Sequence, residues 1–315
     1  MKKQLINKIE VKPFIKRYSG IVFEFSVIRR DHPAFDNWVL SEMTQLVCDE
    51  RHTVDILKYN YNKIKLLDTI ELKNEMIDSG EAFHEYFSKY LTDGYSAVIG
   101  SDRCNNLVYG YSYERKSYIM LGFDESGNLC DNEIIEEELY KAYISGLNGI
   151  PVYFIKQKLC DYKIDWWKLS YDLKSYHSGS SGDDFFSRDK IYGLNVMRRV
   201  IQILEKIKNE EIEINFRPLS IIYDHKRLLE YKFDFLLKNG FEFKYTNIGE
   251  ILKRNKAEAE YCKKLFVKYN NQRNPEYIET IQEKLNKIIR MEDIILPVII
   301  EEIDKYKRNL INNIE

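Results

Sequence analysis

The chain lacks long apolar runs, and its first residues do not predict a secretory signal. Its longest apolar stretches, such as residues 294–300, fall far below the ~18 residues that a membrane-spanning helix needs. The first residues, MKKQLINKIEVKPF, contain no apolar core and no small-residue cleavage site. We therefore expect a cytoplasmic protein that has no membrane partner.

The sequence also lacks a large excess of either charge and lacks closely spaced cysteines. The formal net charge is −2 in 315 residues, with no block of five like charges, so no nucleic-acid partner is predicted. The five cysteines are an odd number without a CxxC pair, which indicates reduced thiols and neither a disulfide framework nor a zinc site. The GSSG run at 179–182 lacks the lysine and spacing of a phosphate loop. No cofactor or metal is predicted.

The N-terminal part has a mixed pattern of helices and strands. Residues 18–30 form a buried helix or strand, and a helix is predicted from Asp36 or Asn37 through Glu50. Apolar residues recur at helical spacing between Ser79 and Gly94. The remaining predictions are three strands within 96–123, whose last two form a hairpin, a helix over 132–143 and a strand over 151–155.

The C-terminal part reads as helical. A helix is predicted over 164–176, and the small polar run 178–184 reads as a linker or loop. Pro297 is expected to kink or split the last helix. We predict an α+β domain over 1–160, an aromatic helix with a Gly/Ser linker over 161–189 and an all-helical domain over 190–315. Its helices are expected over 192–209, 219–239, 248–270 and 275–314.

Three motifs resemble a known family. The segment 107–127, LVYGYSYERKSYIMLGFDESG, is similar to the hairpin HxxLxYGYDxxxxxFxxxGF of butirosin biosynthesis protein H-like proteins, a papain-like group of thiotemplated natural-product pathways. NFRP at 215–218 with YDHK at 223–226 resembles the family's DxRPxxxLxEHK helix. KPF at 12–14 resembles its PFxxxxxNC start. The motifs occur in the family's order, so the resemblance implies a papain-like N-terminal domain.

The resemblance implies acyl transfer from a carrier-protein thioester to an amine. Such chemistry needs a cysteine thiolate, a histidine that activates it and an oxyanion site. This sequence departs from the pattern at both reacting positions. Ser19 or Gly20 stands where the cysteine is expected, and Asn105 or Asn106 stands where the histidine is expected. Losing either member removes most of the rate enhancement, because the pair acts as a unit.

The candidate catalytic residues are Ser19, Cys104 and Asn106. Cys104 is either a reactive thiol, activated by the neighbouring Arg103, or a loop cysteine without a role. Ser19 is either a substitute nucleophile or a capping or buried serine. Asp102, Arg103, Tyr109 and Tyr111 complete a candidate substrate or partner cleft at the hairpin.

A second candidate group lies in the downstream motif. It consists of Arg217, Asp224, His225 and Lys226. Arg217 has the planar fork that binds phosphate or carboxylate, and His225 is a candidate for a cleft between the two parts. The alternative is a polar network in which Arg217 or Asp224 bridges the helical part to the sheet.

Three functions follow from these observations. The first is a specialised-metabolite biosynthesis protein related to papain-like acyl or peptidyl transferases, working on a carrier-bound substrate. The second is a non-catalytic relative that binds or scaffolds a carrier or partner protein. The third is a cysteine peptidase-like hydrolase. The resemblance makes an acyl- or peptidyl-carrier protein the expected partner, while the sequence leaves the oligomeric state open.

Overall fold

The computed structural model divides the chain into two compact units. The first, here the sheet unit, comprises residues 1–35 and 59–162; the second, the helical unit, comprises 36–58 and 163–315. Residues 36–58 therefore belong to the helical unit, although the residues before and after them in the sequence belong to the sheet unit. We call this segment the excursion 36–58. Sequence periodicity does not predict this excursion. The structure describes residues 4–13, 15, 21–42, 44–56, 61–73, 77, 79–100, 105–124, 129–145, 152–180, 190–213, 217–243 and 247–312.

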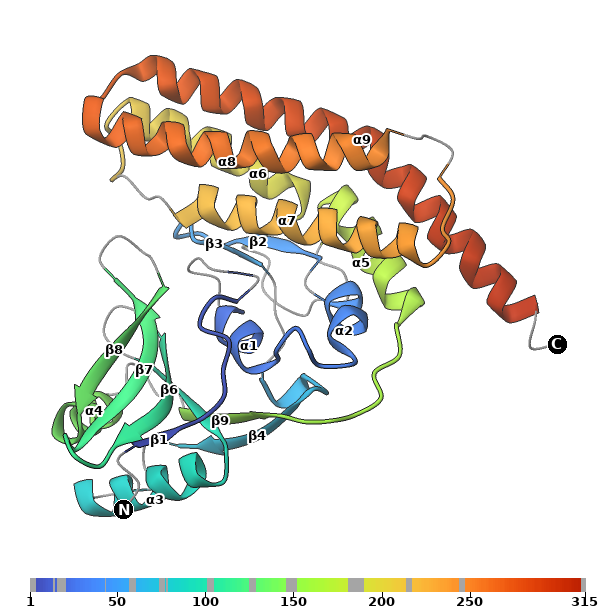
Figure 1. Cartoon of the computed structure of the whole chain (residues 1–315). Helices are drawn as coiled ribbons and strands as arrows, with labels where there is room; N and C mark the ends of the chain where they lie inside the picture. Colours follow the sequence, from blue (N-terminus) through green and yellow to red (C-terminus); the bar gives the residue numbers. More distant parts are fainter. Residues whose placement is uncertain are drawn as a thin grey trace. The chain divides into compact units, whose positions relative to one another are not determined.

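An antiparallel sheet organises the sheet unit (Figure 1). Its strand order is β4-β9-β5-β6-β7-β8, and β1 pairs with β6 beside this path. Together with the helices this makes the fold α+β, as predicted. The strands are β1 (Gln4–Ile6), β4 (Leu67–Leu72), β5 (Ser96–Gly100), β6 (Asn105–Ser112), β7 (Ser117–Phe123), β8 (Leu129–Ile135) and β9 (Val152–Gln157).

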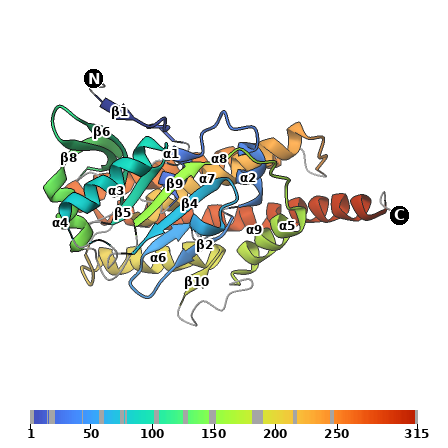
Figure 2. The same ribbon diagram turned by 90° about the horizontal axis from the view of Figure 1, so that it is seen from below.

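Helices α3 (Gly80–Thr92) and α4 (Glu136–Ile144) cover one face of this sheet, here called the core face (Figure 2). The Ser79 side chain caps α3 by accepting a hydrogen bond from the Ala82 amide at 3.2 Å, which confirms the predicted helix start. The buried side chains Phe83, Phe87 and Leu91 recur every four residues and pack on Phe154 and Val108 of the strands.

The opposite face contacts the short helix α1 (Val22–Val27), and we call it the α1 face. Phe23 of α1 lies against Phe123 at the end of β7, with ring centroids 6.3 Å apart. Helix α1 also contacts β9, and the Arg29 amide that follows it donates to Gln157 Oε1 at 3.0 Å. All six residues of α1 are buried. Residues 22–27 thus form a helix, one of the two alternatives left open by the sequence.

The predicted helix over 132–143 is wrong in its first part. Residues 129–135 continue the sheet as β8, paired with β7 from Phe123–Leu129 to Ser117–Ile135. Helix α4 begins only at Glu136, and Glu136–Glu138 form its acidic first turn. Acidic residues favour a helix start, and the β8 sequence LCDNEII gives only weak alternation. The sequence pattern therefore placed the helix start too early.

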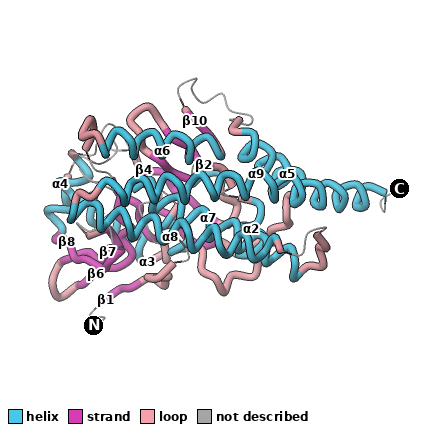
Figure 3. The backbone as a smooth tube through the Cα atoms, turned by 90° about the horizontal axis from the view of Figure 1, so that it is seen from above, coloured by secondary structure: helices cyan, strands magenta, loops and turns pink. Residues whose placement is uncertain are grey.

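Five long helices build the helical unit. Helices α7, α8 and α9 run side by side in Figure 3, and α5 and α6 also contact α9. Each carries a buried apolar stripe at helical spacing. Their bounds are α5 (Trp166–Ser178), α6 (Leu194–Lys208), α7 (Arg217–Lys238), α8 (Ile248–Gln272) and α9 (Pro275–Asn312).

The C-terminal part is not all-helical, because a small sheet completes the unit. Strand β10 (Ile191–Tyr192) pairs with β2 (Leu46–Cys48), which pairs with β3 (Val54–Ile56). The helix predicted through Glu50 is wrong for the same reason: α2 (Phe35–Ser41) ends at Ser41. Leu46 and Cys48 are buried in the strand pairing that follows. One partner of β2, the strand β3, follows closely in the sequence, whereas the other, β10, is distant.

Helix α9 continues through Pro297 and is not split. Proline removes the hydrogen bond to the carbonyl four residues earlier, here Asp293. Pro297 is exposed, as is Asp293, so water can satisfy that carbonyl. Among the described residues, we find no helix with the length and apolar content required to cross a membrane.

Candidate functional site

The predicted catalytic residues Ser19 and Cys104, with Asp102 and Arg103, lie outside the described residues. Their neighbours in sequence are described. Ile21 immediately precedes α1, and Asn105 is the first residue of β6. The antiparallel register places the start of β6 beside the end of β7, where Phe123 contacts α1. The beginning of β6 and helix α1 therefore meet at one end of the sheet.

The two asparagines at the start of β6 point to opposite faces. Asn106 pairs with Ile99, a core-face residue, and its amide occupies the space above Gly122, where a Cβ would collide with it. Successive strand residues alternate, so Asn105 lies on the α1 face. Asn105 is exposed, whereas Asn106 is half-buried. The face that contacts α1 thus presents Asn105, and the predicted Asn106 presents its amide to the opposite face.

Tyr109 also reaches the α1 face. The register between β6 and β7 shifts between Val108 and Gly110, which makes Tyr109 the extra residue of a β-bulge. Its hydroxyl donates to Asp131 Oδ1 at 2.8 Å. Burial and this hydrogen bond raise the pKa of Tyr109, so the phenol stays protonated. The bulge directs the side chain, and Asp131 fixes it.

Tyr111 is buried on the core face instead. Its hydroxyl donates to Glu136, and its ring lies 4.9 Å from that of Tyr118. The Tyr118 hydroxyl in turn lies 3.1 Å from His84 Nδ1. Burial lowers the pKa of His84, while the nearby Glu136 raises it. Tyr109 and Tyr111 were predicted as one cleft, and the structure places them on different faces of the sheet.

The downstream candidates lie within the helical unit. Arg217, at the start of α7, donates to Asp55 of β3 at 2.8 Å and so joins the helix to the small sheet. Asp224 forms an ion pair with Arg227 at 3.4 Å. The side chain of Asp224 is 1% exposed and that of Arg217 is 33% exposed. Arg217 therefore connects α7 to the small sheet, whereas this ion pair of Asp224 lies within α7.

Lys226 is the centre of a buried polar cluster. Its ammonium donates to Glu292 Oε2 and to the Tyr176 hydroxyl, both at 2.7 Å. The Tyr176 hydroxyl donates to the same Glu292 oxygen at 2.8 Å, and the Asn255 amide donates to the other at 3.4 Å. The side chains of Lys226 and Glu292 are both 0% exposed. The ion pair is therefore shielded from water and held by helices α5, α7, α8 and α9.

His225 belongs to this cluster and has a defined tautomer. Its Nε2 lies 2.7 Å from the Thr44 carbonyl, which only accepts, so Nε2 carries the proton. Nδ1 lies 3.5 Å from the Lys226 ammonium and faces it with a lone pair. Burial and Lys226 hold the pKa of His225 well below its usual value. His225 is thus a neutral, interior histidine that binds the excursion 36–58 to α7.

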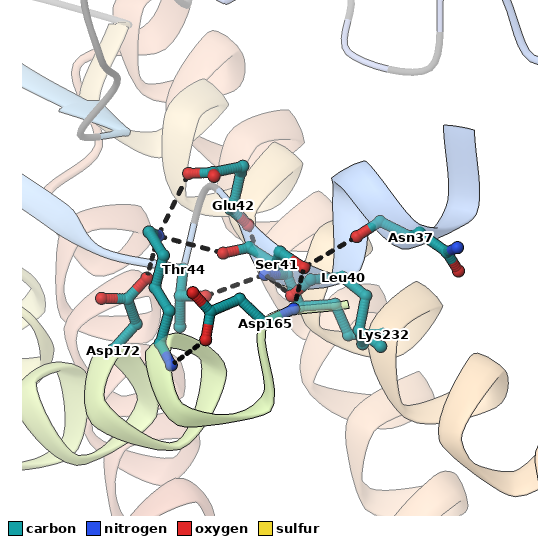
Figure 4. Close-up of polar contacts among 9 residues, drawn as sticks. Asn37, Leu40, Ser41, Glu42, Thr44, Asp165, Asp172 and Lys232 are labelled. Atoms are coloured by element: carbon teal, nitrogen blue, oxygen red, sulfur yellow. Dashed lines mark hydrogen bonds and ion pairs between the residues drawn. The ribbon is translucent and has the colours of Figure 1, made fainter. Parts of the chain in front are cut away.

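Two lysines that the sequence reading did not select hold the end of α2 (Figure 4). Lys232 Nζ donates to the Leu40 carbonyl at 3.0 Å, to the Glu42 carbonyl and to Thr44 Oγ1 at 2.8 Å. Lys168 Nζ donates to the Ser41 carbonyl at 3.0 Å and pairs with Glu42 at 3.1 Å. These cations satisfy carbonyls that the helix end leaves without partners. Asp172 also pairs with Lys168 at 2.6 Å.

Among the cysteines that the structure describes, Cys48 and Cys262 are buried, and neither is suited to nucleophilic chemistry. Burial raises the pKa of Cys48 to about 11 and that of Cys262 to about 12. A thiol is reactive as the thiolate, so both are inert near neutral pH. Within the described ranges, no group of three or more His, Cys, Asp or Glu residues is placed to hold a metal ion.

Comparison with known proteins adds no relative. No family model matches the chain, and no curated protein is significantly similar to it.

Proposed function

We propose that this protein is a non-catalytic relative of papain-like acyl transferases that binds a carrier-borne acyl group or its carrier in thiotemplated biosynthesis. The observation that carries the proposal is Asn105. It lies at the start of β6 on the face that contacts α1. By the resemblance of the motifs, this is where a papain-like enzyme would carry its imidazole. A carboxamide neither takes up nor releases a proton near neutral pH, so it cannot act as a general base.

The arrangement of the sheet unit supports the papain-like part of the proposal. Papain-like chemistry requires a helix N-terminus and the start of a strand to lie together, so that nucleophile and base can meet. Here α1 contacts the sheet at the end of β7, beside the start of β6. The resemblance of the motifs is the basis for assigning the protein to a thiotemplated pathway. The site residues, more than the fold, decide the function.

Acyl transfer through Cys104 is the second candidate. Cys104 immediately precedes Asn105 in the sequence, and the resemblance implies that this hairpin carries the catalytic base in papain-like enzymes. An activated thiolate there would attack a thioester and release the carrier thiol.

One experiment separates the two candidates. The protein is mixed with an acylated carrier protein encoded beside its own gene, and binding is measured by calorimetry. Free carrier thiol and the intact mass of the protein are followed over the same period. Binding without thiol release or an added acyl mass is the expected result. Thiol release with an acyl adduct would support transfer through Cys104, and the Cys104→Ala variant would then abolish it. Absence of both binding and turnover would overturn the assignment to this pathway.

A further inference from the structure

Thr44 is the point at which two basic side chains of one helix meet the excursion 36–58. Its carbonyl accepts from His225 and its hydroxyl accepts from Lys232, at 2.7 Å and 2.8 Å. Both residues belong to α7 and are seven positions apart, so they lie on the same side of the helix. The segment 40–48, which includes the end of α2 and strand β2, is therefore attached to α7 through groups that can change protonation.

A second proton on His225 would be poorly tolerated. The imidazole already donates from Nε2, so the added proton would occupy Nδ1, which lies 3.5 Å from the Lys226 ammonium. Two like charges at that distance inside the protein repel strongly. His225 is 0% exposed, so water does not screen them. The charged imidazole is therefore stable only if the side chain leaves this environment.

The groups facing His225 offer no compensating charge. Glu292 of α9 is engaged by Lys226, and the Tyr176 hydroxyl of α5 donates to the same carboxylate. Asn255 of α8 is neutral. Lys232 of α7 adds a further positive charge. From the excursion, the Thr44 carbonyl accepts the hydrogen bond of Nε2 and carries no negative charge. Farther out, Lys168 is paired with Glu42 and Asp172.

We propose that His225 makes the attachment of segment 40–48 to α7 acid-sensitive. Proton uptake by His225 releases this segment while the helices remain folded. The inference is independent of the proposed binding function, because it concerns only the helical unit. It predicts that acid favours an open state, in which His225 is exposed and has its ordinary affinity for protons.

Hydrogen exchange as a function of pH tests this proposal on the full chain. Below pH ~6.5, the opening equilibrium of peptides covering 40–48 should rise about tenfold for each pH unit, after correction for intrinsic exchange rates. Peptides covering 278–289 of α9 should show no such slope. In His225→Gln, whose amide can still donate to Thr44 but does not titrate, the slope at 40–48 should vanish. His177→Gln changes a half-exposed histidine of the same unit and should keep the slope.

Equal slopes in the wild type and in His225→Gln would overturn the proposal. A second measurement applies even if that variant does not fold. In wild-type protein labelled in its histidines, the imidazole nitrogen shifts should show His225 still neutral just below pH ~6.5, where exchange at 40–48 is already rising because the protein opens transiently. Titration of His225 near pH 6.5 with unchanged protection of 40–48 would also refute the proposal.

Discussion

Lys226 and Glu292 form an ion pair of 2.7 Å in which neither side chain is exposed to solvent. Tyr176 bridges the two charges, because its hydroxyl accepts from the ammonium and donates to the carboxylate. Removing two charges from water is costly, and the hydrogen bonds offset that cost only when every partner is present. We expect the pair to favour this packing of α5, α7 and α9, because truncating one side chain leaves the other charge desolvated and unpaired.

Replacing one partner should destabilise the helical unit strongly. We expect Lys226→Met to lower its free energy of unfolding by about 3–5 kcal/mol, because Glu292 is left buried and unpaired. All three tryptophans of the chain, Trp38, Trp166 and Trp167, lie in this unit, so tryptophan fluorescence in a denaturant titration reports its unfolding. The double variant Lys226→Met/Glu292→Leu should lose less than Lys226→Met alone. A larger loss in the double variant would contradict the account.

Gly122 leaves room for the Asn106 amide on the core face of the sheet. Gly122→Ala should destabilise the sheet unit by about 1 kcal/mol, because the new Cβ displaces the terminal oxygen of that amide. Asn106→Ala removes the obstacle, so Gly122→Ala should cost much less in that background. Hydrogen exchange of β6 and β7 peptides measures both effects. Equal costs of Gly122→Ala in the two backgrounds would show that Asn106 does not occupy this space.

Lys232 should make stability depend on pH above neutrality. Burial lowers its pKa from 10.5 to about 7 in the folded protein. Between these values the unfolded chain binds more protons than the folded one, so the free energy of unfolding increases as pH rises from about 7 to about 10. Lys232→Met should reduce this increase. Denaturant titrations by tryptophan fluorescence at pH 7, 8.5 and 10 measure the difference, and parallel profiles for the two proteins would contradict it.

The thiols should differ in reactivity with iodoacetamide. Cys48 and Cys262 are 0% exposed and have raised pKa values, so they should remain unmodified in the native protein at pH 8. Cys130 and Cys160 are partly exposed and should react slowly. Peptide mass mapping over time gives each rate. A rate at Cys104 far above that of Cys160 would indicate an activated thiol and would favour the acyl-transfer alternative.

Local patterns predicted much of the fold. The helix after Ser79, the hairpin of β6 and β7 and the long C-terminal helices follow from apolar periodicity and turn residues, which act between neighbours in the chain. Strand β2 could not be predicted in this way, because its 3 residues are too few to show alternation and one of its partners, β10, comes from a distant part of the chain. The helix start at Ser79 could be predicted from the sequence, because Ser79 lies only three residues from the Ala82 amide that it caps.

The candidate site was less predictable, for a physical reason. His225 and Lys226 were selected by a motif, but their partners Thr44 and Glu292 lie 181 and 66 positions away. No periodic signal connects residues so distant. The choice between Asn105 and Asn106 likewise required the strand register, because a shift of one residue reverses the face. Lys226 lies between His225 and Arg227 in the sequence, so its neighbours gave no sign that it is buried.

The most direct test of the account places a catalytic pair back into the chain. Ser19→Cys is combined either with Asn105→His or with Asn106→His, and each protein is treated with the acetyl thioester of N-acetylcysteamine. Intact mass measures acetylation, and thiol release measures turnover. We predict that the Asn105→His pair becomes acetylated and releases thiol, whereas the Asn106→His pair remains as inert as the wild type. Acetylation of the Asn106→His pair alone, or of neither pair, would contradict the claim that Asn105 replaces a papain-like base.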